Sequence, residues 1–411
     1  MEPNCEAPWT LARESEGPLA DHLDTFARRL HEQGFEPRVI GVHIRTAARF
    51  SRWLQAEHVA AEALTDEHAR RFLEKLEYRE RVRQGAAATL RRLIEVLRGL
   101  GVCGTATTIS ELTPIERIVA AFANHLHKDQ ELSVRTLVQY CPVAKSFLSE
   151  RFGTGPVDLA TLRGLDVINF VQRQAARVSP ARAKAVTIAL RSFLRYARYC
   201  GETPVDLAGT VPTVANWSMT GIPRAISPDH LRTVLASSRR DTPLGRRDYA
   251  ILLLLARLGL RSSEIVSLTL DSIDWKAGSI AVLGKAGHAA VLPLPVEVGE
   301  AVAQYLQSGR PTCACRALFL CANAPIRGLG AGPTVGTIVR AAIVRAGIKT
   351  RSQGAHQFRH ALATDMLRKG ATLTEIGSIL RHQHPKTTGI YAKVDFDALR
   401  PLGLRWPGGA A

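Results

Sequence analysis

The sequence predicts a mainly helical protein with one small β-sheet (an α+β fold), in which two tandem helical modules precede a mixed domain. Three observations predict this fold class. The first half of the chain contains the same helical pattern twice, the second half has a glycine-rich hairpin between helices, and 411 residues suffice for two or three domains.

The helical modules are recognised as copies because their residues recur in the same order. Phe26 and Phe122 each precede a Leu-His pair at the same spacing, and each copy closes with a basic helix and a glycine, Gly101 or Gly201. The offset grows only from 96 residues at the phenylalanines to 100 at the glycines. Apolar residues fall at helical spacing within each copy, which predicts four helices per copy. A repeat this long indicates a duplicated domain rather than a solenoid.

A change in composition marks the boundary before the mixed domain. Residues 202–226 contain three prolines and two glycines but no sustained apolar period. Ser227 and Pro228 then supply an N-cap and a first helical residue. We therefore predict a first helical module at 1–110, a second at 111–202, a linker at 203–226, a mixed domain at 227–400 and a tail at 401–411.

Within the mixed domain, an apolar helix is predicted at Asp248–Leu258. Two strands are predicted at Ser279–Leu283 and Ala289–Leu294, around a turn that contains two glycines. Helices are expected to resume near Thr334 and to continue to about Tyr391.

The chain is strongly basic, with 54 Lys and Arg against 37 Asp and Glu and a net charge of +17. This balance suits a polyanion, because each phosphate that a cation neutralises releases counterions. A membrane protein would need a spanning or anchoring segment, whereas the apolar run Ala250–Ala256 is too short to span. The first twenty residues carry acidic residues and no apolar stretch, so we expect no signal peptide there. We therefore expect a DNA-binding protein of the cytoplasm with no membrane association.

The seven cysteines are dispersed and odd in number, which indicates reduced thiols in a cytoplasmic protein. Cys313, Cys315 and Cys321 form a loose group. The first pair has one intervening residue and no fourth cysteine lies nearby, so a loop is a better interpretation than a zinc site. We expect no metal and no other cofactor.

One set of polar residues in the mixed domain suits a single reaction. It combines two guanidiniums, an ammonium, two imidazoles and a phenol: Arg261, Lys285, His356, Arg359, His382 and Tyr391. A phenol oxygen can attack a phosphodiester when cations hold the non-bridging oxygens and the leaving sugar oxygen receives a proton. Forked guanidinium donors provide the cations, and lysine or histidine the acid and base. The phosphotyrosine keeps the energy of the broken bond, so a hydroxyl can reverse the step without ATP.

These six residues, in this order, resemble the full catalytic set of the tyrosine recombinase (phage integrase) family. The contexts are similar too: Gly-Leu-Arg-Ser-Ser-Glu at the first arginine, His-x-Phe-Arg-His at the second, and Thr-Thr-x-x-Tyr at the tyrosine. The likeness extends over about 223–394, and residues 115–201 resemble the family's core-binding domain. The resemblance implies a site-specific DNA recombinase that cleaves and rejoins strands through a 3′-phosphotyrosine at Tyr391, for integration, excision or transposition of a mobile element.

The resemblance also implies roles and partners. Arg261 and Arg359 would bind the scissile phosphate, and Lys285 would protonate the leaving 5′ oxygen. His356 would assist proton transfer, and His382 would hydrogen-bond the phosphate. The implied partners are double-stranded DNA with paired recombinase-binding sites and other copies of the chain in a synaptic homotetramer, alone or with partner recombinases.

The sequence departs from the family pattern in three places. Arg381 stands where the family usually has glycine, beside His382. His288 and Ala290 follow Lys285 where further basic residues are common, which predicts weaker minor-groove contact from the hairpin. The extra helical copy differs from the small β-rich arm-binding domain of many phage integrases and resembles transposon-borne recombinases.

Taken singly, each of these residues has a common structural explanation, such as a helix cap or a core tyrosine. Glu264 is interpreted as a brace for Arg261, and His360 as either packing or support of the site. The presence of all six predicted residues in the family's order favours a catalytic site over six separate structural roles. Two alternatives stay open: an accessory DNA-binding protein without catalysis, and a type IB topoisomerase. A transcription regulator would account for the charge but not for the six residues.

Overall fold

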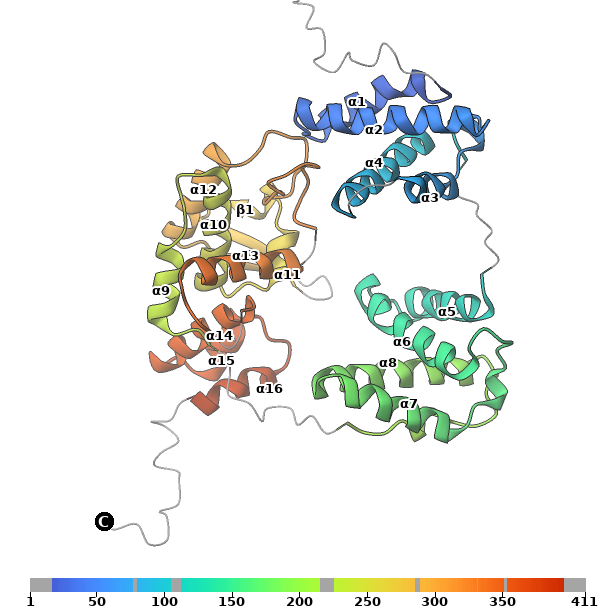
Figure 1. Cartoon of the computed structure of the whole chain (residues 1–411). Helices are drawn as coiled ribbons and strands as arrows, with labels where there is room; N and C mark the ends of the chain where they lie inside the picture. The colour runs from blue at the N-terminus through green and yellow to red at the C-terminus, as the bar shows by residue number, and fades with distance from the viewer. Residues whose placement is uncertain are drawn as a thin grey trace, which may run out of the picture. The chain divides into compact units, whose positions relative to one another are not determined.

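The computed structural model of the chain describes residues 17–76, 80–104, 112–214, 225–284, 289–330, 332–350 and 353–394, without the side chains of 80–84, 393 and 394. The chain divides into two compact units, one of them Thr105–Thr220 and the other made of Met1–Gly104 with Gly221–Ala411. Figure 1 follows the chain from the blue helices near its N-terminus to the red helices near its C-terminus. We refer below to the N-terminal module (17–104), the second module (112–214) and the mixed module (225–394).

The N-terminal module contains four α-helices: α1 Leu23–Glu32, α2 Pro37–Ala56, α3 Asp66–Lys75 and α4 Glu80–Gly99. Its apolar core includes several aromatic rings. Phe26, Phe50 and Phe72 are buried, and the ring centroids of Phe50 and Phe72 lie 5.1 Å apart. The long helix α2 packs against the other three, because its apolar residues recur along one face.

The second module repeats this arrangement with α5 Pro114–Asn124, α6 Val134–Phe152, α7 Gly164–Arg177 and α8 Pro180–Tyr199. A π-helical turn extends α5. Phe122, Phe147 and Phe193 are buried in its core, and Phe122 occupies the position that Phe26 has in the first copy. The prediction of four helices per copy is confirmed.

The mixed module combines helices with a three-stranded antiparallel sheet in the order β1-β2-β3. Its elements are α9 Pro228–Ala236, α10 Pro243–Arg257, α11 Ser262–Ser267, the 3-10 helix Leu270–Ser272, β1 Ile273–Asp274, β2 Ser279–Leu283, β3 Ala289–Pro293, α12 Val296–Ser308, α13 Gly332–Arg345, α14 His356–Arg368, α15 Leu373–Ile379, α16 Pro385–Thr388 and the 3-10 helix Gly389–Val394. The predicted pair of strands is confirmed, with Ile280 opposite Leu292. The strand β1 was not predicted, because two residues are too few to show an alternating pattern.

The helix α10 forms the centre of the mixed module. Every residue from Ala250 to Ala256 is buried, because α9, α11, α12, α13 and α14 all pack against this helix. A helix that is apolar on all sides is expected to lie within a core. Among the described residues, none of the helices has the length and apolar character needed to cross a membrane.

The start of α10 depends on a glycine. A Cβ at Gly245 would lie 1.6 Å from the carbonyl oxygen of Arg239, a backbone atom, whereas a Cβ at Gly336 in α13 would have no neighbour within 4 Å. We expect Gly245→Ala to destabilise the protein by about 1–3 kcal/mol through this overlap. Gly336→Ala should stabilise it by about 0.5–1 kcal/mol, because alanine loses less backbone entropy in a helix. Thermal unfolding of both variants tests this prediction, and equal shifts in Tm would contradict it.

Candidate active site

The turn between α10 and α11 positions the first arginine of the site. Gly259 in this turn has a φ of +56°, and a Cβ there would lie 2.8 Å from Leu380 Cδ2. The backbone conformation therefore favours glycine, and a Cβ there would displace the Leu380 side chain. Arg261, two residues later, is the N-cap of α11.

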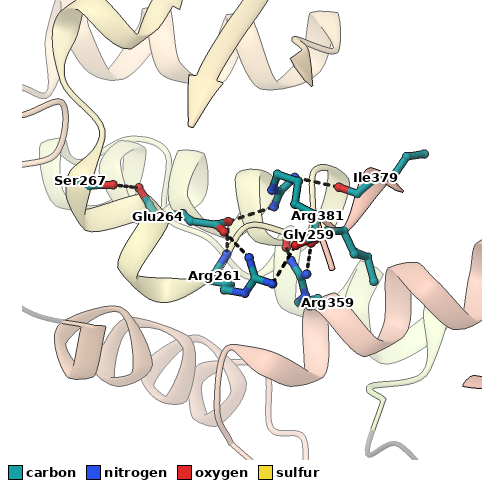
Figure 2. Close-up of polar contacts among 8 residues, drawn as sticks. Gly259, Arg261, Glu264, Ser267, Arg359, Ile379 and Arg381 are labelled. Carbon is teal, nitrogen blue, oxygen red and sulfur yellow. Dashed lines mark hydrogen bonds and ion pairs between the residues drawn. The ribbon is translucent and has the colours of Figure 1, made fainter. Parts of the chain in front are cut away.

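A buried carboxylate braces Arg261. Glu264 is 1% exposed, and its Oε1 accepts a hydrogen bond from Arg261 Nη1 at 2.6 Å. Its Oε2 accepts from the backbone N–H of Arg261 at 2.8 Å and from Arg381 Nη2 at 2.9 Å. Figure 2 shows Glu264 between the two guanidiniums. Burial raises the pKa of Glu264, but the backbone N–H and the two guanidiniums outweigh it, so that the pKa lies below its usual value.

The second arginine, Arg359, lies on α14 and is 3% exposed. Its Nη1 donates to the carbonyl of Gly259 at 2.5 Å, and its Nη2 donates to the carbonyl of Leu380. One guanidinium thus joins α14 to two segments that are distant in the sequence. Burial lowers the pKa of Arg359 to about 10, so the group is still protonated at neutral pH.

The end of α15 directs His382 into the site. The helix closes with a Schellman motif, in which Arg381 N–H donates to the carbonyl of Ser378 at 3.0 Å and His382 N–H to that of Gly377 at 2.9 Å. The ring of His382 is then fixed by Thr388, whose Oγ1 lies 2.7 Å from His382 Nδ1. The second threonine of the Thr-Thr-x-x-Tyr segment therefore orients this histidine.

Tyr391 lies in the 3-10 helix that follows α16 and is 2% exposed. Its hydroxyl oxygen is 3.0 Å from His360 Nδ1, and its ring is nearly parallel to that of His382, with centroids 6.4 Å apart. Burial raises the pKa of Tyr391, although Arg359 and Arg261 act in the opposite direction. The phenol is therefore protonated at neutral pH and needs a base to act as a nucleophile.

The structure gathers four of the six predicted residues around the end of α15. Arg261 Nη2 donates to the carbonyl of Arg381 at 3.3 Å, Arg359 donates to the neighbouring carbonyl, and the His382 and Tyr391 rings lie beside each other. A fifth, His356, occupies the first turn of α14, three residues before Arg359. Lys285, together with His288, lies outside the described residues, so its predicted role stays a prediction.

His360 is the residue whose role the sequence left undecided, and the structure places it against the Tyr391 hydroxyl. Its ring centroid lies 6.3 Å from that of His356, one helical turn earlier on α14. This i, i+4 spacing was visible in the sequence and puts both imidazoles on one face of the helix. Which of them would meet the tyrosine was not visible, because that depends on how the 3-10 helix packs on α14.

All three imidazoles are in their neutral form near neutral pH. Burial lowers the pKa of His356, of His360 and of His382, and nearby cations lower it further, to about 4 for His382. A neutral imidazole offers one donor and one acceptor nitrogen. The site can therefore combine cationic grip from arginines with proton acceptance and donation from histidines.

Comparison with known proteins shows the family to which the chain belongs. The sequence profile of the phage integrase family matches residues 224–398. Over 405 residues the chain is 48% identical to y4rA of Sinorhizobium fredii, described as an integrase/recombinase, and the match covers 98% of each protein. It is 31% identical to tyrosine recombinase XerD of Listeria monocytogenes over 65% of this chain and 87% of that protein. The chain belongs to the tyrosine recombinase family and is a site-specific recombinase.

Solved structures share the fold. The XerH site-specific recombinase in its post-cleavage complex with a palindromic difH substrate matches with a TM-score of 0.56 and 19% identity, over 76% of this chain and 88% of that chain. A lambda integrase tetramer bound to a Holliday junction matches with a TM-score of 0.53 and 13% identity, over 74% and 86% of the two chains. The mainly helical fold with a small sheet is thus that of known recombinases.

Acid should destabilise the protein through these histidines. The pKa of His382 is lowered from the ordinary 6.5 to about 4 in the folded state, so between these values the unfolded chain binds more protons. The free energy of unfolding therefore falls as the pH drops through 6.5 toward 4. We expect Tm to decrease between pH 7 and pH 5, and to decrease less in His382→Gln. His230→Gln, at an exposed position of the same module, is the control, and an equal decrease in both variants would contradict the assignment.

Proposed function

We propose that this recombinase cleaves and rejoins DNA strands through a 3′-phosphotyrosine intermediate on Tyr391. The observation that carries the proposal is the convergence of both arginines on the carbonyls that precede His382, whose ring lies beside that of Tyr391. Two forked cations and a phenol in one site suit attack on a phosphodiester. The order and contexts of the six residues support the same mechanism.

In the proposed cleavage step the Tyr391 oxygen bonds to the phosphorus and the bond from phosphorus to the 5′ oxygen breaks. Arg261 and Arg359 bind the non-bridging oxygens and offset the charge that develops on them. His382 adds a hydrogen bond to the phosphate. The reverse attack, by a 5′ hydroxyl of another strand, restores the diester and releases the tyrosine, so the two steps need no net energy input.

The proposed cleavage step involves two proton transfers, one from the phenol and one to the leaving oxygen. Neutral His360 accepts the phenol proton at Nδ1, an atom 3.0 Å from the hydroxyl oxygen. Lys285 gives a proton to the leaving 5′ oxygen, as the family resemblance implies, and His356 assists this transfer. Religation reverses both transfers.

The proposed substrate is double-stranded DNA with paired recombinase sites, held by a homotetramer in the synaptic complex. The net charge of +17 suits this substrate. The recombinases with the same fold were solved on a difH substrate and, as a tetramer, on a Holliday junction.

We further propose that residues 1–110 lengthen the footprint on DNA and that residues 111–411 hold the minimal recombinase. The reaction is proposed to move a mobile element.

Tyr391→Phe should retain DNA binding and lose covalent capture, because the change removes the nucleophilic oxygen and little volume. The probe is a labelled nicked duplex that carries the binding site, after footprinting on the DNA next to the coding region has mapped that site. Capture is measured as a denaturant-resistant complex. Tyr305→Phe, which also removes a buried hydroxyl from the mixed module, should still be captured. A Tyr391→Phe protein that still forms the complex would show that another residue is the nucleophile.

Two alternatives are separated by this capture assay together with a supercoiled plasmid that carries two copies of the site. An accessory DNA-binding protein would shift the duplex without any covalent complex. A type IB topoisomerase would form the complex but relax supercoiled plasmid without exchanging strands between two sites. Strand exchange between two sites is the outcome that we expect.

Cleavage should proceed in excess EDTA and without nucleotide. The two guanidiniums and Lys285 supply the positive charge that a metal ion brings to other phosphoryl transfers. The measurement is the rate of covalent capture with and without EDTA, with a magnesium-dependent restriction enzyme as the control for chelation. A strict magnesium requirement for cleavage, as opposed to assembly of the synaptic complex, would contradict the mechanism.

A further inference from the structure

Arg381 has a backbone conformation that favours glycine. Its φ is +55°, and it directly follows the C-cap of α15, at the left-handed position of the Schellman motif. A residue with a Cβ costs free energy there relative to glycine. Such a conformation persists in a folded protein where other interactions of the residue compensate for it, and it often marks a functional site.

The compensating interactions come from the side chain. Arg381 is 11% exposed in its side chain, and it donates from Nη2 to Glu264 at 2.9 Å and from Nη1 to the carbonyl of Ile379 at 2.8 Å. The Glu264 carboxylate that it contacts is the one that braces Arg261 (Figure 2). The arginine is therefore built into the site and does not extend into solvent.

The second guanidinium changes the charge of the cluster. A carboxylate paired with Arg261 alone would offset most of the positive charge that this arginine presents to a phosphate. With Arg381 on the same carboxylate, Arg261, Arg359 and Arg381 are three cations against the one anion of Glu264, a net charge of +2. Arg381 also donates a hydrogen bond to Oε2 of Glu264, while Oε1 of the same carboxylate accepts one from the guanidinium of Arg261.

We propose that Arg381 is a positioning residue of the recombinase site. It shares the Glu264 carboxylate with Arg261, and thereby holds the Arg261 guanidinium in place and limits how much of its positive charge the carboxylate offsets while the phosphate reacts. The inference rests on the proposed function, since it assumes that Arg261 binds the scissile phosphate. Arg381 acts through Glu264 and not by its own contact with DNA.

A double-mutant cycle tests this coupling. Arg381→Gln, Glu264→Gln and the double variant are made in the full-length chain, with Arg381→Lys as the charge-conserving change. The rate of covalent capture of the mapped nicked duplex is measured at saturating protein, and the Kd for the same duplex is measured separately. Arg316→Gln is the matched control, because Arg316 is an exposed arginine of the same module that pairs with Asp271.

Arg381→Gln should lower the rate of capture about tenfold and change Kd less than about twofold, whereas Arg381→Lys should retain more of the rate. In the Glu264→Gln background the same Arg381→Gln change should alter the rate less than about twofold. The Arg316→Gln control should react like the wild type.

Two results would overturn the inference: an Arg381→Gln protein as fast as the wild type, or an equal loss of rate in both backgrounds, which would mean that Arg381 does not act through Glu264. If Arg381→Gln does not fold, Arg381→Gly takes its place, because glycine suits the left-handed backbone. Absence of covalent capture by the wild type would instead contradict the proposed function, so the two failures are distinguishable.

Discussion

The guanidinium of Arg359 is the interaction on which the site depends. It is buried on α14 and donates hydrogen bonds to the carbonyls of Gly259 and Leu380. These two residues shortly precede Arg261 and His382, which belong to the proposed site. Burial of a charge costs free energy unless its hydrogen bonds are made. These two bonds fix the plane of the guanidinium and hold the turn before α11 close to the end of α15.

The core explains why this contact forms. Five helices pack against α10, and Gly259, just beyond its C-terminal end, lies against the side chains of Leu362 in α14 and Leu380 at the end of α15. Arg261 and His382 therefore come from separate turns that meet at one place. The polar site is thus built at the edge of an apolar centre, where its cations are partly shielded from water.

Burial away from water also determines the protonation states of the histidines and of Tyr391. Burial lowers the pKa of each histidine and raises that of Tyr391, so the site combines neutral imidazoles with a protonated phenol and charged arginines. This division follows from desolvation, which disfavours the charged form of each titrating group. In the proposed mechanism, desolvation thus provides a protonated nucleophile beside a neutral base.

The sequence by itself determined the class of fold, the paired four-helix modules, the two longer strands and the residues proposed for catalysis, because periodicity and short motifs are local properties of the chain. It also marked Arg381 as a departure from the family pattern. Only the tertiary structure decided that His360 meets Tyr391, that Thr388 orients His382 and that Glu264 is shared by two arginines. These contacts join segments whose meeting depends on packing around α10, and no local pattern encodes which side chains packing will bring together.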